Sequence, residues 1–192
     1  MFTKITLENF RSFDHIELDL TEKGNTAKHL AILYGENGAG KSNLMSAFVL
    51  LPELTRTMDA RAAYERILAQ GAIFQDENME KEMREHIRQR LRDMSAIIKD
   101  YQMADCENPI IAEYEFNIDG NNGCYRVEFG QDEILHERLE FVLNRRRGLY
   151  FDCSVTGINI NDSIVEKEQG KEFLTDVKEM AKRYWGKHSL LA

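Results

Sequence analysis

The sequence predicts an α/β (α+β) fold in which an antiparallel β layer and a helical insertion accompany a strand–loop–helix unit. Three observations support this prediction. An apolar run, Leu30–Tyr34, leads directly into a glycine-rich loop and a helical pattern. Stretches of alternating apolar and polar residues lie near both ends of the chain, as in half-buried strands. A strongly charged helical pattern separates them between about residues 55 and 105.

Two strands are predicted at the N-terminus, over Phe2–Phe10 and His15–Leu20, because apolar and polar residues alternate in both. The short link between them, Arg11–Asp14, favours an antiparallel pair. The next apolar run, Leu30–Tyr34, is continuous rather than alternating, which is typical of a strand buried on both faces. We therefore expect both faces of that strand to be covered.

Three helices are predicted after this run. Lys41–Leu51 should be helical and end near Pro52, since proline disfavours helical geometry in the residue before it. Arg56–Gln70 indicates a second helix, and Asp76–Tyr101 a long third one with apolar residues at helical spacing. The simpler interpretation packs this apolar stripe on its own domain, and the other uses it to bind a partner. The stripe consists of Met79, Met83, Ile87, Leu91, Met94, Ile98 and Tyr101.

The period changes from that of helices to that of strands after Pro109. Ile110–Ile118 and Cys124–Phe129 alternate on either side of a turn at Asp119–Gly123, which predicts a β-hairpin. Ile134–Leu143 fits either a third strand or a short helix. The remaining predicted elements are two short strands and an amphipathic helix, over Gly148–Phe151, Gly157–Ile160 and Lys171–Trp185.

The glycine-rich loop Gly35–Ser42 reads G-E-N-G-A-G-K-S and matches every fixed position of the Walker A phosphate-binding motif. Its glycines leave room where backbone N–H groups converge on phosphates. The helix that starts near Lys41 adds N-terminal N–H groups, which favour an anion. We predict that Lys41 is the catalytic residue that reaches the β- and γ-phosphates, and that Ser42 binds Mg²⁺. The expected cofactors are therefore ATP and Mg²⁺.

Composition limits the classes of function. A hydrophobic fraction of 43% and a charged fraction of 30% are typical of a soluble globular protein. No apolar run approaches the roughly 20 residues that span a bilayer, so no membrane partner is expected. The three scattered cysteines favour a reducing, cytoplasmic location, and neither they nor the five scattered histidines have metal-site spacing. The net charge of −8 argues against broad nucleic-acid binding, although it is compatible with ATP held by a local loop and Mg²⁺.

Two motifs together establish a family resemblance. Asn9–Phe13 reads N-F-R-S-F at the end of the first strand, and Gly35–Leu44 reads G-E-N-G-A-G-K-S-N-L. With both motifs, the chain resembles the start of ABC-type ATPases of the SMC, RecF and OLD kind, and most closely the AAA_15-type ATPases. The resemblance implies that residues 1–192 are the N-terminal lobe of an ABC-type ATPase domain, with a helical insertion at about 55–105.

The resemblance also assigns binding residues outside the loop. It implies that Arg11, with Ser12, lies close to bound nucleotide, and that Asn43 stands where the loop enters the helix. Arginine suits this position because its charge is permanent and its fork fits phosphate oxygens. A surface salt bridge is the alternative role of Arg11. The expected nucleotide-binding residues are Gly35, Glu36, Asn37, Gly38, Ala39, Gly40, Lys41, Ser42, Asn43, Arg11 and Ser12.

The second half of the family's pattern does not occur in this sequence. That half contains a Leu-Ser-Gly-Gly signature and a Walker B strand ending in Asp-Glu, and the nearest imitation is Leu149–Asp152, followed by Cys153. We therefore expect the rest of the ATPase domain to be missing and the chain alone to bind nucleotide weakly and hydrolyse it poorly. None of the glutamines considered as Mg²⁺ sensors is assigned, namely Gln70, Gln75, Gln102 and Gln131.

Three functions remain as hypotheses. In the first, the full-length ATPase forms an ATP-dependent homodimer and couples hydrolysis to DNA repair or anti-phage defence, with DNA or a nuclease as partner. The second is a self-contained P-loop NTPase such as a kinase, for which Arg145–Arg147 is the basic cluster available. The same cluster is the candidate DNA contact, but the simpler interpretation is a solvated loop. The third is a non-enzymatic module in which Asp76–Tyr101 recruits a partner.

Overall fold

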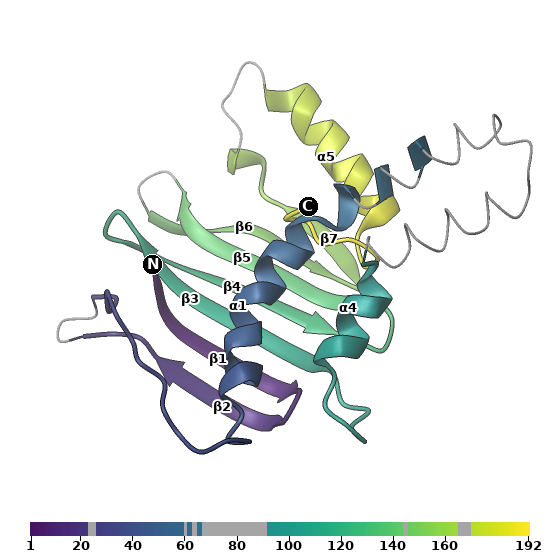
Figure 1. The fold of residues 1–192 in the computed structure, drawn as a ribbon. Coiled ribbons are helices and arrows are strands. Elements are labelled where there is room, and N and C mark those ends of the chain that lie inside the picture. Colours follow the sequence, from purple (N-terminus) through teal and green to yellow (C-terminus); the bar gives the residue numbers. More distant parts are fainter. Residues whose placement is uncertain (23–25, 60, 63–64, 67–91, 144–145, 165–169) are drawn as a thin grey trace, which may run out of the picture.

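Among the described residues, seven strands form one antiparallel sheet in this computed structural model, and helices cover one of its faces (Figure 1). The structure describes residues 1–22, 26–59, 61–62, 65–66, 92–143, 146–164 and 170–192. The strand order is β2-β1-β3-β4-β5-β6-β7. The strands are β1 (Phe2–Phe10), β2 (Phe13–Asp19), β3 (Ile110–Ile118), β4 (Asn121–Phe129), β5 (Ile134–Leu143), β6 (Arg146–Ser154) and β7 (Gly157–Ile160). The helices are α1 (Lys41–Thr55), α4 (Met94–Tyr101), the 3₁₀ turn η1 (Asp162–Ile164) and α5 (Gly170–Tyr184).

The predicted N-terminal hairpin is confirmed. β1 and β2 pair in antiparallel register, with Leu7 opposite Ile16 and Phe10 opposite Phe13. Only Arg11 and Ser12 therefore remain in the turn. The φ angle of Arg11 is 53°, a left-handed conformation that non-glycine residues rarely adopt.

The second hairpin, β3–β4, is also confirmed, but its turn is shorter than Asp119–Gly123. Asp119 and Gly120 have φ angles of 52° and 80°, as in a type I′ turn. Because the twist of this turn matches that of the strands, two residues suffice, and Asn121–Gly123 pair within β4.

Ile134–Leu143, for which both a strand and a short helix were possible, forms strand β5. β5 and β6 stay paired as far as Leu143 and Arg146, so the loop interpretation of Arg145–Arg147 is wrong for Arg146 and Arg147. Arg145 lies outside the described residues. The short strand expected at Gly157–Ile160 is β7.

One apolar core lies between the covered face of the sheet and the helices. α1 buries residues at spacings of three and four, which places them on one side of the helix. They are Leu44, Ala47, Leu50 and Leu54. The sheet contributes Ile5 and Leu7 from β1, and Tyr114 of β3 donates a hydrogen bond to the Ala47 carbonyl at 2.7 Å. This bond joins the middle of the sheet to the middle of α1.

The expected end of α1 near Pro52 is wrong by one turn, because the helix continues to Thr55. Proline removes only its own backbone N–H and the packing of later residues can compensate. Fully buried Leu54 supplies that packing. No helix among the described residues is long and apolar enough to cross a membrane.

The long third helix is interrupted within the described residues. Asp93 has an extended backbone and caps α4 by accepting a hydrogen bond from the Ala96 amide at 2.9 Å. A continuous helix over Asp76–Tyr101 is therefore wrong at Arg92 and Asp93, because a capping residue is not itself helical. Most of Arg56–Gln70 and of the insertion at about 55–105 lies outside the described residues. The described members of the apolar stripe pack on their own domain, and they are Met94, Ile98 and Tyr101.

The prediction of a doubly buried strand at Leu30–Tyr34 is wrong. Leu30, Ile32 and Tyr34 are 74%, 75% and 93% exposed, and the segment belongs to none of the described strands. A strand buried on both faces needs neighbours along its edges and layers above and below it. The seven described strands pair with one another in a single sheet, and Leu30–Tyr34 has no ladder pairing with any of them.

Candidate nucleotide-binding site

The glycine-rich loop opens helix α1, as predicted. Gly40 is the N-cap residue, and the φ angles of Gly38 and Gly40 are 89° and 83°. These left-handed angles suit glycine, because other residues pay for them in steric strain. Gly40 supplies no side-chain cap, so the first N–H groups of the helix that starts at Lys41 lack a side-chain acceptor. Such a helix start favours an anion.

Lys41 bends back over the start of its own loop. Its Nζ donates to the carbonyl oxygens of Gly35 at 2.7 Å and of Glu36 at 2.6 Å. Both acceptors are neutral carbonyls, whereas a phosphate oxygen carries a negative charge that adds a direct attraction to the ammonium group. A phosphate oxygen would therefore compete well for this ammonium group. The residues present fit a triphosphate in charge and in backbone geometry.

The turn at Arg11–Ser12 lies against the loop and helix, which joins the two motifs singled out in the sequence. Asn43 Nδ2 donates to Ser12 Oγ at 2.7 Å. A Cβ atom placed on Gly40 would meet the ring of Phe13 at 2.7 Å, so glycine is required for this close approach. Ser12 and Asn43 are thus brought to the start of α1 together with the loop.

Arg11 faces α4 instead. Its guanidinium carbon lies 5.0 Å from the ring centroid of Tyr101, and its backbone N–H donates to the Tyr101 carbonyl at 2.8 Å. Arg11 Nε is buried and has no hydrogen-bond partner among the described residues. Arg11 has no salt bridge among the described ion pairs either, and its role in nucleotide binding stays a prediction.

Sequence reasoning missed two residues that shape this site. Phe13 packs on Gly40, and Tyr101 holds Arg11. Phe13 could have been found, because it is the last residue of the N-F-R-S-F motif. Tyr101 carries no such signal, since the apolar stripe to which it belongs explains its burial without any reference to Arg11.

The imitation of Walker B at Leu149–Asp152 does not lie at the loop. It is part of β6, which β5, β4 and β3 separate from β1. Asp152 instead accepts a hydrogen bond from Arg138 Nη1 at 2.9 Å and contacts His136 Nε2 at 2.7 Å. This aspartate is therefore engaged in a cross-strand charge network rather than at the phosphate site.

A groove of about 780 Å³ runs beside the loop between α1 and the apolar segment before it. Lys41 and Ser42 lie at its polar end, and the rest of its lining is mainly apolar. Met45 and Val49 on this side of α1 are 51% and 52% exposed. α1 thus has a second apolar side, opposite the one that packs on the sheet.

Comparison with known proteins assigns this chain to a family. Residues 1–182 match the family model AAA_15, described as an AAA ATPase domain. The chain belongs to the AAA_15 family. It is also similar to the DNA replication and repair protein RecF of Bacillus mycoides (strain KBAB4), at 41% identity over 49 residues. That match covers 26% of this chain and 12% of RecF, so the chain spans only a small part of this relative.

The family match confirms the resemblance to SMC- and RecF-like P-loop ATPases. The matched range includes both the turn at Arg11–Ser12 and the loop Gly35–Ser42. The family match thus assigns residues 1–182 to an AAA ATPase domain of the P-loop class.

Proposed function

We propose that this chain binds Mg-ATP through the loop Gly35–Ser42 and the first turn of α1. One observation supports this proposal above the others. In a chain of an ATPase family, helix α1 starts without a side-chain cap directly after Gly38 and Gly40, which have left-handed φ angles. The Lys41 ammonium group at this helix start hydrogen-bonds to the backbone of the same loop. Backbone N–H groups, the helix start and a mobile ammonium group together suit the charge of a triphosphate.

The roles follow from chemistry and position. Lys41 exchanges its two carbonyl acceptors for oxygens of the β- and γ-phosphates, and the hydroxyl of Ser42 binds Mg²⁺. Ser12 positions the start of α1 through Asn43. Arg11 reaches the nucleotide only if its side chain leaves Tyr101, and its Nε, which has no partner among the described residues, is consistent with such an exchange.

We further propose that this chain is one lobe of an ABC-type ATPase domain and that other strands complete it. The exposed apolar segment Leu30–Tyr34 and the open apolar side of α1 support this view. Strands from further polypeptide would pair with Leu30–Tyr34. They would also supply the signature motif and the Walker B carboxylates. The residues of this chain then hold ATP but hydrolyse it slowly, because the Walker B glutamate that would orient the attacking water comes from those further strands.

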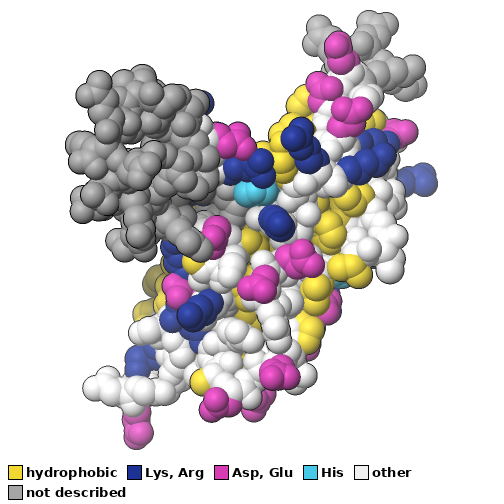
Figure 2. Space-filling model, turned by 90° about the vertical axis from the view of Figure 1, so that its right-hand side faces the viewer, with side chains coloured by type: hydrophobic (Ala, Val, Ile, Leu, Met, Phe, Trp, Pro, Cys, Tyr) yellow, Lys and Arg dark blue, Asp and Glu magenta, His cyan; other side chains and the backbone are white. Residues whose placement is uncertain are grey.

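The role of the whole protein is proposed by analogy. The name of the RecF relative supports a function in DNA repair, and anti-phage defence and an ATP-dependent homodimer are further proposals. On the side shown in Figure 2, described basic side chains alternate with acidic ones, which suits a local rather than a broad contact with DNA. For a kinase, Arg147 would have to be free, but it pairs with Glu140 at 2.8 Å.

A calorimetric titration with Mg-ATP and with AMP tests the proposal. We expect ATP to bind at least about tenfold more tightly, since a hydrogen bond to a charged group contributes roughly 1.5–3 kcal/mol and AMP lacks the β- and γ-phosphates. Removing Mg²⁺ with EDTA should weaken ATP binding in the same titration. Equal affinity for ATP and AMP would contradict a triphosphate site at Lys41.

A further inference from the structure

A buried carboxylate lies on the covered face of the sheet, on strand β5. Glu137 of β5 is 0% exposed and stands opposite Val127 of β4 and Cys153 of β6. No lysine, arginine or histidine among the described residues forms an ion pair with it. Burial of an ionised carboxylate is costly unless donors surround it, so a residue of this kind needs an explanation.

The donors that surround Glu137 come mainly from one segment. Trp185 Nε1 and the Leu190 amide each donate to Glu137 Oε2 at 2.9 Å. Ser189 Oγ donates to Oε1 at 2.5 Å, and the hydroxyl of Tyr125 on β4 adds a bond at 2.9 Å. Burial raises the pKa of Glu137, although all four donors oppose that shift. We call residues 185–191, which follow α5, the strap.

The strap and the end of α5 also touch the residues that follow α1. The Arg61 guanidinium carbon lies 4.4 Å from the ring centroid of Tyr184, and burial together with the nearby charge of Arg61 lowers the pKa of His188. Met58 shares a cavity of about 130 Å³ with Trp185 and other residues of this region. The strap therefore lies between the sheet and the continuation of the helix that starts at the glycine-rich loop.

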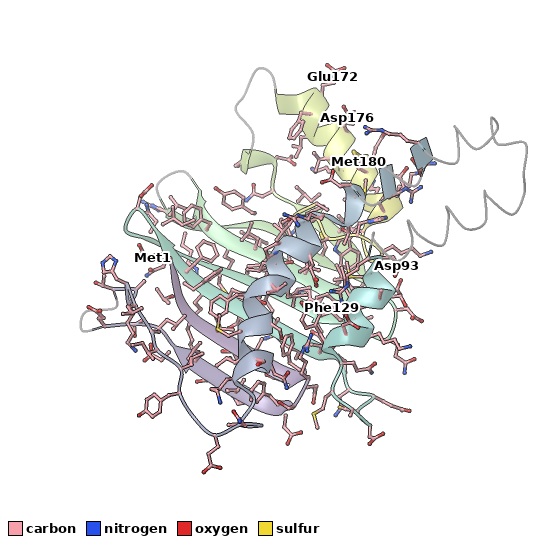
Figure 3. The ribbon with its side chains drawn as sticks, in the orientation of Figure 1. Met1, Asp93, Phe129, Glu172, Asp176 and Met180 are labelled. Carbon is pink, nitrogen blue, oxygen red and sulfur yellow. The ribbon has the colours of Figure 1, made fainter. Side chains whose placement is uncertain are left out.

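Along the rest of α5, two large apolar side chains remain exposed. Phe173 and Met180 are 60% and 49% exposed, and Figure 3 shows Glu172 at the end of α5 that lies farthest from the sheet. The Ile134 amide donates to the Gly186 carbonyl at 2.8 Å, which is a further hydrogen bond between the sheet and the strap. Leu174 and Val177 pack on the core and Lys178 pairs with Asp162, so the strap adds to these contacts at the C-terminal end of α5.

We propose that Glu137 is a clasp, a positioning residue that fixes the strap on the sheet and thereby holds α5 against the residues that follow α1. An apolar side chain cannot replace it, because the Trp185 indole N–H and the Leu190 amide would be buried without an acceptor. The clasp is a conformational device that is independent of ATP binding. It joins the strap at the end of the chain to a strand about 50 residues earlier in the sequence.

Fluorescence of Trp185, the single tryptophan of the chain, tests the clasp directly. In Glu137→Ala we expect a red-shifted emission, several-fold stronger quenching by acrylamide and loss of hydrogen-exchange protection at the Leu190 amide. Tyr125→Phe is the matched control, since it removes one donor to the same carboxylate but leaves the strap's own donors in place. This variant should resemble the wild type in all three measurements.

If Glu137→Ala folds, two results overturn the proposal. One is a folded Glu137→Ala protein, as judged by circular dichroism, whose Trp185 emission and Leu190 protection are unchanged. The other is a Tyr125→Phe protein whose strap loosens as much as in Glu137→Ala. If Glu137→Ala does not fold, Ser189→Ala decides. Faster hydrogen exchange of the Leu190 amide in Ser189→Ala than in Tyr125→Phe supports the clasp, and an equal or slower exchange rate overturns it.

Discussion

Replacing Lys41 with alanine weakens Mg-ATP binding by about 10- to 150-fold, which corresponds to the roughly 1.5–3 kcal/mol of a hydrogen bond to a charged group. Among the described residues the Lys41 ammonium group donates hydrogen bonds to carbonyl oxygens of its own loop, so the substitution removes no described hydrogen bond to the core. Calorimetric titration of both proteins with Mg-ATP measures the effect.

Lys99→Ala provides the charge-matched control. Lys99 is an exposed residue of α4, and its removal changes the net charge by the same amount without altering the glycine-rich loop. It should leave ATP affinity unchanged, and urea unfolding should give similar stability for both variants. If Lys41→Ala binds Mg-ATP as tightly as the wild type, the phosphate assignment of the loop is wrong.

Gly40→Ala is expected to damage both the loop and its contact with the N-terminal turn. The substitution forces alanine to φ 83° and places a Cβ atom 2.7 Å from the Phe13 ring. Gly38→Ala separates these effects, because Gly38 has φ 89° but no atom within 4 Å of the added Cβ. Backbone strain of about 1–2 kcal/mol should be common to both variants. Only Gly40→Ala should lose additional stability and ATP affinity.

A double-mutant cycle identifies the source of that additional loss. Combining Gly40→Ala with Phe13→Ala removes the ring that the new methyl group meets, so part of the loss should be recovered. Chemical unfolding measures the stabilities of the four proteins. Equal destabilisation by Gly38→Ala and Gly40→Ala, or no recovery in the double variant, would show that Phe13 does not brace the loop.

Local patterns in the sequence were enough to predict most elements. Alternation predicted β1, β3 and β4, and the glycine-rich motif predicted the loop and the start of α1 at Lys41. Each of these depends on residues close in the chain. The turn at Asp119–Gly120 was predicted too long, because its length depends on the left-handed φ angles of both residues.

Features that depend on distant residues could not be predicted in the same way. Leu30–Tyr34 has the composition of a buried strand, but burial requires neighbouring strands that local composition cannot specify. The partner of Arg11 is Tyr101, from an element far along the chain. Glu137 left a partial signal, since it falls in phase with Leu139 on the covered face of β5, but its donors in the strap were not predictable.

The central claim is that a triphosphate binds at the start of α1, and backbone amide NMR during a Mg-ATP titration tests it most directly. We predict saturable shifts concentrated in the amides of Gly38–Asn43, with smaller shifts at Arg11–Ser12 through the Ser12–Asn43 contact. Lys41→Ala should show the same shifts only at much higher ATP concentrations, in keeping with its weaker binding. Saturable shifts that leave Gly38–Asn43 unchanged and cluster elsewhere, or shifts that saturate in Lys41→Ala at the same ATP concentrations as in the wild type, would contradict the account.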